Sequence, residues 1–284
     1  MMSSLKLFLK KIIKILTKLF IVLLNKINSG RYVIDELYSV IINRKKKVYY
    51  KNTEIQFYIP NRLNYFRVET FHLKEPETLE WIENFDKNSV FYDIGSNIGL
   101  YSIYASKKVG CDTYAFEPSC FNLELLAKNI YLNKLSKDIK IIPIPLSSKK
   151  KISTFNMSNT DAGGALSTFD EKFTYDGSTL NNLFKYSTIS FTLDECVDIL
   201  NLPPPDYIKI DVDGIEHLIL SGGLKVLKKS KSILIELNEN FKDQHDQSIN
   251  FLKDCGFKFL KKSSLDIDKQ DNYKGMFNQI WIKK

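Results

Sequence analysis

One short apolar run that leads into two closely spaced glycines is the strongest indication of the fold: Val90-Phe91-Tyr92-Asp93-Ile94-Gly95-Ser96-Asn97-Ile98-Gly99-Leu100-Tyr101. The residues up to Ile94 predict a buried strand, and the residues after Gly99 predict a helix. Glycine has no Cβ atom, so Gly95 and Gly99 allow a tight turn and a close approach of the backbone to a ligand. A helix that begins here also offers free N–H groups. The stretch therefore predicts a strand–turn–helix unit that holds a small molecule.

A second apolar run, Thr113–Phe116, is followed by the acidic residue Glu117. The first two strands of a doubly wound sheet end side by side, so Glu117 can accept hydrogen bonds from both hydroxyls of a ribose. A dinucleotide site would carry G-x-G-x-x-G, whereas this chain has two glycines four positions apart. The carboxylate of Asp93 would repel a pyrophosphate but suits an ammonium or sulfonium group. The pattern therefore favours S-adenosylmethionine over NAD.

Short apolar runs alternate with helical segments along the rest of the chain, which predicts an α/β fold with a mostly parallel, doubly wound sheet. A helix is predicted over Glu75–Phe85, with Pro76 in its first turn. Residues 148–190, rich in Ser, Thr, Asn, Lys and Phe, read as a long insertion between the third and fourth strands. The five predicted strands are Ser89–Ile94, Thr113–Phe116, Lys140–Ile144, Tyr207–Ile210 and Ser232–Leu237.

Four motifs resemble, in the same order, the FkbM family of S-adenosylmethionine-dependent methyltransferases. They are D-I-G-S-N-I-G at 93–99, F-E-P at 116–118, T-L-D at 192–194 and Y-I-K-I-D-V-D-G-I-E at 207–216. The resemblance runs from about Glu75 to Asn238 and implies a class I, Rossmann-like methyltransferase fold. It also implies transfer of a methyl group to a hydroxyl of a sugar, polyketide or related metabolite. Asp213 departs from the many relatives that have glutamate at its position.

The resemblance implies a set of cofactor-binding residues. Asp93, Gly95, Asn97 and Gly99 would line the methionine side, and Glu117 would hold the ribose. Ser147, in P-L-S after the third strand, would lie near the adenine. The predicted set is completed by Ser96 and Pro118, which lie within these motifs, and by Asp211 at the end of the fourth strand.

Methyl transfer to oxygen is an in-line displacement, and an enzyme assists it by orienting the acceptor hydroxyl and removing its proton. Asp211 ends the fourth predicted strand, at the edge where open α/β sheets bind ligands, and is the first choice for this role. Lys209, also a catalytic candidate, lies two positions earlier on the same sheet face. It either forms a plain ion pair with Asp211 or lowers the pKa of Asp211 and keeps it ionised. Three further catalytic candidates lie nearby: Asp213, His217 and Glu236.

Some of these residues also have structural interpretations. Asp213 reads equally well as the cap of a helix that begins near Gly214, with Glu216 as its N3 partner. A lone histidine on a helix, such as His217, is more often structural than catalytic. Asp161-Ala-Gly-Gly is either a plain turn or, by the resemblance, a loop near the substrate. No metal site is predicted, because no cluster of His, Cys, Asp and Glu has ligand spacing.

The N-terminal segment carries the positive charge of the chain. The net charge is +8, and residues 1–51 contain twelve Lys and Arg against two acids, so the rest of the chain is slightly acidic. This distribution argues against a nucleic-acid groove on the body. In residues 5–24 lysines recur every four positions on one side of a helix, opposite Leu, Ile and Phe, and the apolar runs are too short to span a bilayer. Two interpretations of this segment stay open: a helix that lies on an anionic membrane surface, or a helix that packs on its own domain.

The sequence therefore predicts two parts: a basic amphipathic extension over residues 1–45, and an FkbM-like methyltransferase domain over 46–284 that begins with a short β-hairpin. The expected activity is S-adenosylmethionine-dependent O-methylation of a sugar, glycolipid or related metabolite. Alternatives are an RNA or protein methyltransferase and a non-catalytic, membrane-associated scaffold. The expected partner is a small-molecule or glycan acceptor, with no nucleic acid. The expected location is cytoplasmic. If the N-terminal helix binds a membrane, the protein is expected at the cytoplasmic face of that membrane.

Overall fold

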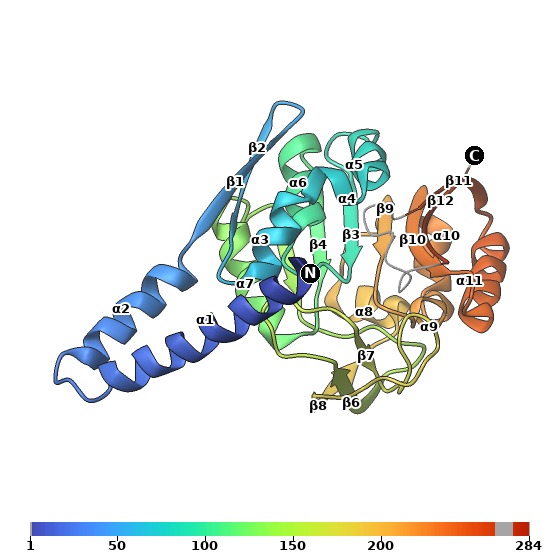
Figure 1. The fold of residues 1–284 in the computed structure, drawn as a ribbon. Coiled ribbons are helices and arrows are strands. Elements are labelled where there is room, and N and C mark those ends of the chain that lie inside the picture. Colours follow the sequence, from blue (N-terminus) through green and yellow to red (C-terminus); the bar gives the residue numbers. More distant parts are fainter. Residues whose placement is uncertain (1, 265–274, 284) are drawn as a thin grey trace.

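The structure, a computed structural model, describes residues 2–264 and 275–283. Over these residues a seven-stranded sheet forms the centre of the protein, in the order β11–β12–β10–β9–β3–β4–β5. Helices lie on both of its faces (Figure 1). The strands are β3 (Val90–Ile94), β4 (Asp112–Phe116), β5 (Ile139–Ile142), β9 (Tyr207–Ile210), β10 (Ser232–Asn238), β11 (Lys258–Ser264) and β12 (Met276–Ile282).

Five neighbouring strands, from β10 to β5, are parallel, and β12 runs antiparallel to both of its neighbours, β10 and β11. The five are the strands predicted from the sequence, with bounds that differ by one or two residues at most. β3 pairs with β4 on one side and with β9 on the other, so the chain changes direction across the sheet at β3. Ligands of open α/β sheets bind at such a switch point, outside the carboxyl ends of the strands. The predicted α/β, doubly wound class is confirmed.

Two hydrophobic cores flank the sheet, because successive residues of a strand face opposite sides. Phe91 of β3 belongs to the first core, and Tyr92 belongs to the second. The first core is covered by α5 (Pro76–Glu83), α6 (Leu100–Val109), α7 (Cys120–Leu132) and the β-hairpin of β1 (Lys45–Tyr50) and β2 (Thr53–Tyr58). The second is covered by α8 (Leu193–Leu200), α9 (Glu216–Ser221), α10 (Leu224–Lys229) and α11 (Lys242–Asp254).

Local sequence signals explain where several of these helices begin. Thr192 and Glu195 form a reciprocal capping box at the start of α8. Asp194, in the same T-L-D motif, accepts hydrogen bonds from the backbone N–H groups of Lys225 and Val226 at 3.0 and 2.9 Å. The motif therefore fixes the starts of both α8 and α10, and α5 begins with Pro76 as predicted.

The insertion between β5 and β9 folds into its own three-stranded antiparallel sheet, in the order β7–β6–β8. Its strands are β6 (Lys151–Met157), β7 (Ser167–Phe169) and β8 (Phe184–Ser190). Figure 1 shows this sheet below the carboxyl ends of β3 and β4. Two short helices, α3 (Arg62–Glu69) and α4 (Phe71–Lys74), follow the β-hairpin. The sequence predicted the insertion but none of its strands.

The N-terminal segment forms a helical hairpin of α1 (Met2–Leu24) and α2 (Gly30–Ile42), which projects from the body as an arm (Figure 1). The helices meet closely at Gly30, where a Cβ atom would lie 1.7 Å from the backbone oxygen of Leu24. The amphipathic helix was predicted, whereas α2 was not. Among the described residues no helix combines the length and the apolar character needed to cross a membrane.

Candidate active site

A cavity of about 400 Å³ opens at the carboxyl ends of the parallel strands, around the switch point at β3. Its floor is made by residues that follow β3, β4 and β9, and Glu236 of β10 lies at one end. Helices α3 and α4, the segment after β5 and the loop between β6 and β7 contribute much of the walls. The volume lies in the range of small-molecule sites, and the position is the one that the fold predicts for a ligand.

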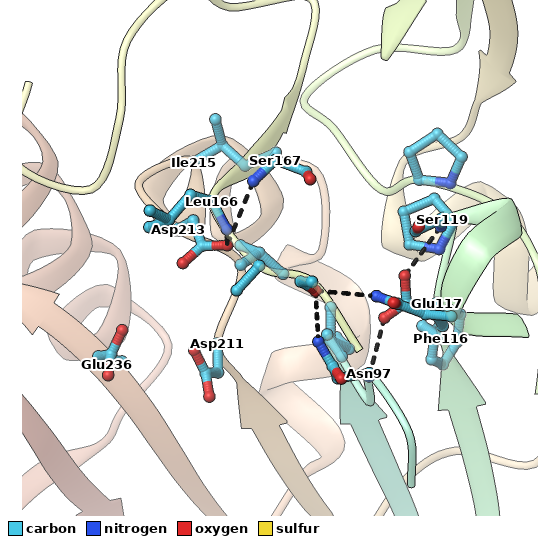
Figure 2. Close-up of a pocket in the computed structure, with 18 of the residues that line it drawn as sticks. Asn97, Phe116, Glu117, Ser119, Leu166, Ser167, Asp211, Asp213, Ile215 and Glu236 are labelled. Atoms are coloured by element: carbon cyan, nitrogen blue, oxygen red, sulfur yellow. Dashed lines mark hydrogen bonds between the residues drawn. The ribbon is translucent and has the colours of Figure 1, made fainter. Parts of the chain in front are cut away.

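Glu117 lies just after β4 and is held by backbone N–H groups. The N–H of Asn97 donates to its Oε2 and the N–H of Ser119 to its Oε1, both at 2.8 Å (Figure 2). Burial raises the pKa of Glu117 to about 7, although these two donors partly offset the effect. The carboxyl is therefore fixed in direction while it lines the cavity, as a group that recognises ligand hydroxyls must be.

Two polar atoms beside Glu117 are buried without a hydrogen-bond partner in the described part of the chain. They are Oδ1 of Asn97 and Oγ of Ser119, and both residues line the cavity. A buried polar atom without a partner costs free energy, so such atoms are normally satisfied by a ligand or by water. This end of the cavity therefore suits a polar ligand.

Asp211 lies just after β9 and pairs with Lys209, whose Nζ is 2.6 Å from its Oδ2. Lys209 is fully buried, and it pairs in register with Asp93 of β3. The carboxylate of Asp93 accepts a hydrogen bond from the hydroxyl of Ser102 at 2.5 Å. Burial alone would raise the pKa of Asp211, but the charge and hydrogen bond of Lys209 bring it below its usual value. The ion pair and the ionised Asp211 agree with the sequence interpretation.

Asp213 does not cap a helix, so that interpretation is wrong. Helix α9 begins only at Glu216, and Asp213 takes a left-handed conformation with φ of 62°. Its Oδ2 accepts from the N–H groups of Leu166 at 2.6 Å and Ser167 at 3.4 Å. Burial and the nearby Asp211 raise its pKa to about 6. Asp213 therefore joins the insertion to the carboxyl end of β9.

Glu236 completes a group of three carboxyls at the end of the cavity away from Glu117 (Figure 2). Burial and the charge of Asp211 raise the pKa of Glu236 well above its usual value, while Lys74 opposes the effect. The environments of Asp211 and Glu236 thus push their pKa values apart, which favours one ionised and one neutral carboxyl.

The structure brings some predicted site residues to the cavity and leaves others outside it. Seven line the cavity: Gly95, Asn97, Glu117, Pro118, Asp211, Asp213 and Glu236. Six do not: Asp93, Ser96, Gly99, Ser147, Lys209 and His217. The functional roles of both groups stay predictions.

Local packing explains the places of the residues outside the cavity. The N–H of Ser96 donates to the carbonyl of Phe116, and the N–H of Ser147 donates to the carbonyl of Phe191, both at 3.0 Å. A Cβ atom on Gly99 would lie 2.7 Å from Cδ1 of Leu126, so this glycine serves helix packing. His217 faces Phe241 on the second-core side, where burial lowers its pKa.

No sequence pattern predicted that α3 and α4 contribute to the cavity. Arg67 and Lys74 line the cavity, and their charges help to lower the pKa of Asp211. Nε of Arg67 donates to the carbonyl of Gly163 at 2.9 Å. These helices carry none of the family motifs, and isolated basic residues such as Arg67 and Lys74 gave no signal for a site.

The loop of residues 162–167 forms one wall and is fastened from several directions. Nδ2 of Asn97 donates to the carbonyl of Gly164 at 2.8 Å, and Asn122 of α7 donates to the same oxygen at 3.1 Å. Asn61 and Asn64 donate to the carbonyl of Ala162 at 2.9 and 2.7 Å. Asp161-Ala-Gly-Gly forms a turn, in which the N–H of Gly164 donates to the carbonyl of Asp161 at 2.8 Å, and Gly164 lines the cavity. The position of this segment near a substrate stays a prediction.

Comparison with known proteins identifies the family. The Methyltransferase FkbM domain matches residues 93–259, more than half of the chain. The chain belongs to the FkbM methyltransferase family.

One similar protein is the hexuronic acid methyltransferase AglP of Haloferax volcanii, 27% identical over 157 residues. The match covers 55% of this chain and 59% of that protein, so the chain spans less than two thirds of its relative.

Solved structures resemble the fold at low identity. A putative SAM-dependent methyltransferase from Streptococcus mutans has a TM-score of 0.49 at 11% identity, covering 84% of this chain and 55% of its own. M. jannaschii TYW2, solved in complex with AdoMet, has a TM-score of 0.43 at 12% identity, covering 85% of this chain and 88% of its own.

Gly95 is required by the close approach of two backbone segments. It has φ of 85°, and a Cβ atom there would lie 1.9 Å from the backbone oxygen of Asp211. We expect Gly95→Ala to lower the free energy of unfolding by at least ~3 kcal/mol, measured by urea denaturation. Gly256 is the matched control, because it has φ of 86° but open space around it. Gly256→Ala should cost only about 1–2 kcal/mol, and equal losses in the two variants would contradict the role of the contact.

Buried carboxyls make stability depend on pH. Burial raises the pKa of Glu117 to about 7, of Glu216 to about 7 and of Asp213 to about 6. The folded state then binds more protons than the unfolded state between about pH 4 and pH 7. The stabilisation is complete below that window and is lost as pH rises through it. Between about pH 5 and pH 8 we expect the free energy of unfolding of the ligand-free protein to fall by roughly 2–3 kcal/mol for each of the two glutamates and by roughly 1–1.5 kcal/mol for Asp213.

Glu216→Gln isolates one of these carboxyls, since Glu216 lies outside the cavity and accepts from the N–H groups of Val212 and Gly214. The variant should show a smaller decrease between about pH 5 and pH 8 than the wild type in urea denaturation. If the free energy of unfolding decreased equally in both proteins, folding would not raise the pKa of Glu216, and the prediction would be wrong.

Proposed function

We propose that the protein is an S-adenosylmethionine-dependent O-methyltransferase that modifies a hydroxyl of a sugar, with a sugar acid as the preferred acceptor. One observation carries this proposal. A single cavity has an oriented, hydroxyl-accepting carboxyl, Glu117, at one end and a group of three carboxyls around Asp211 at the other. The family assignment supports methyl transfer as the reaction.

The residues at the first end fit the proposed cofactor. Glu117 would accept from the two ribose hydroxyls, and Oδ1 of Asn97, which has no partner among the described residues, would accept from an N–H group. The apolar side chains of Ile144, Leu146 and Phe155 line a region suited to a flat adenine ring. When bound, S-adenosylmethionine supplies a methyl group on a positively charged sulfur.

At the other end, Asp211 would orient the acceptor hydroxyl and accept its proton. A base must be ionised to accept a proton, and Lys209 keeps Asp211 in that form from a buried position. Glu236, held neutral beside it, would donate a hydrogen bond to another oxygen of the acceptor. Asp211 would thus act as the base and Glu236 as a hydrogen-bond donor, because their surroundings shift their pKa values in opposite directions.

Basic residues at the cavity support an acidic acceptor. In the described part of the chain, Arg67 uses only Nε for a hydrogen bond, which leaves the rest of its guanidinium free to bind a carboxylate. Lys74 also lines the cavity, 3.5 Å from the carboxylate of Glu75. Similarity to a hexuronic acid methyltransferase supports the same substrate class.

Two measurements test the proposal. Titration calorimetry should show micromolar binding of S-adenosylhomocysteine, the product form of the cofactor. Transfer of labelled methyl groups should then be at least tenfold faster, in kcat/KM, to a hexuronic acid glycoside than to the matching neutral hexoside. Equal rates would remove the preference for sugar acids, and transfer only to RNA or protein acceptors would replace the proposed acceptor class. A folded protein that binds no S-adenosylhomocysteine would overturn the proposal.

A further inference from the structure

The hairpin of α1 and α2 exposes an unusual amount of apolar surface. Phe8, Leu16 and Leu19 of α1 are 59%, 59% and 60% exposed, and Val40 of α2 is 65% exposed. Leu24 is buried at the turn between the helices, but no other part of the described protein covers the apolar side of α1. Packing on its own domain, one of the two readings of this segment, therefore does not occur. Apolar patches of this kind mark a surface that binds a partner or a membrane.

The same hairpin is strongly basic. Four exposed lysines of α1, Lys10, Lys11, Lys14 and Lys18, form no salt bridge with any described residue. In helical projection they lie on one side, and most of the exposed apolar residues occupy the opposite side and its flanks. Asp35 and Glu36 of α2 are the only acids in residues 1–42. The surface is thus both apolar and cationic, with the two properties separated by helix face.

We propose that the α1–α2 hairpin binds the surface of a bilayer that contains anionic lipid. The apolar side chains enter the boundary between head groups and acyl chains, and the lysines contact the lipid phosphates. A nucleic acid would neutralise the lysines but leave the apolar side in water. A second copy of the hairpin would cover the apolar side but bring two basic surfaces together, with two acids per copy to offset them. Of these three partners, only a lipid surface matches both features.

The decisive experiment measures co-sedimentation of the full chain with vesicles. Binding should be at least tenfold tighter to vesicles of phosphatidylcholine with phosphatidylglycerol than to phosphatidylcholine alone, and it should weaken in about 0.5 M salt. The triple variant Lys10→Gln, Lys14→Gln, Lys18→Gln should lose roughly a hundredfold in affinity for the anionic vesicles. The double variant Leu16→Ser, Leu19→Ser should lose at least tenfold for the same vesicles.

A matched control removes the same charge from the body of the protein. Lys137, Lys229 and Lys242 are exposed and form no salt bridge with described residues, and their triple change to Gln should leave vesicle binding within twofold. All variants should keep the thermal transition of the wild type, since the altered side chains lie on the surface. If the control variant bound anionic vesicles as weakly as the α1 lysine variant, net charge alone would explain the loss of binding, and the proposal would be overturned. Failure of the wild type to bind anionic vesicles, or a dimer in sedimentation that Leu16→Ser, Leu19→Ser dissociates, would also overturn it.

Discussion

We expect Asp211→Asn to lower kcat for methyl transfer by a factor of about 100 to 10,000, the usual effect of removing a general base. An amide cannot accept the hydroxyl proton, and it also leaves the buried Lys209 without its partner at 2.6 Å. Binding of S-adenosylhomocysteine should change much less, because Glu117 lies at the other end of the cavity. Single-turnover assays with saturating cofactor measure the effect, and circular dichroism checks the fold.

Glu236→Gln is the matched control for this prediction. Because burial and the charge of Asp211 favour the neutral form of Glu236, the change to Gln removes no charge and should lower kcat less than about tenfold. A larger loss from Glu236→Gln than from Asp211→Asn would assign the role of base to Glu236. Equal losses would indicate that the two carboxyls act as one unit.

The second large effect concerns Glu117. We expect Glu117→Gln to weaken binding of S-adenosylhomocysteine about thirtyfold or more, which corresponds to ~2 kcal/mol. Both carboxylate oxygens accept from backbone N–H groups, so the amide NH₂ of Gln must face one of these donors and disturb the site. Titration calorimetry measures the change directly.

Glu124→Gln on the same stretch of chain gives the comparison. Glu124 is exposed on α7 and forms only an (i, i+4) salt bridge with Lys128, so its loss should leave cofactor affinity unchanged. If Glu117→Gln bound S-adenosylhomocysteine as tightly as Glu124→Gln, the assignment of Glu117 to the ribose would be wrong.

The sequence was sufficient to predict the parallel core of the fold. Its strands are short, nearly continuous apolar runs, because both faces of each strand are buried, and such runs stand out between helices. Strands β8 and β11 were not predicted, because they contain lysines and serines and have exposed residues, so neither forms a continuous apolar run. The division of the chain at residue 45 stays a prediction.

The site was predicted in part for a similar reason. Glu117 and Asp211 follow strand ends directly, so the fold alone places them at the cavity. Asp93 lies one position before the end of β3 and shares the face of Phe91, which is packed into the first core. The alternation of side chains along a strand predicts which residues share a face, but it does not predict which face borders a ligand. Arg67 and Lys74 reach the cavity through long-range packing, which no local pattern encodes.

The cavity is built from segments that lie far apart in the chain, from Leu63 of α3 to Met276 of β12. During synthesis at roughly 5–20 residues per second, these two residues emerge about 10 to 40 s apart. A nascent chain therefore has no complete binding site until its last strand has left the ribosome. The residues proposed to bind the cofactor, from Asn97 to Phe155, are thus synthesised before the cavity is complete.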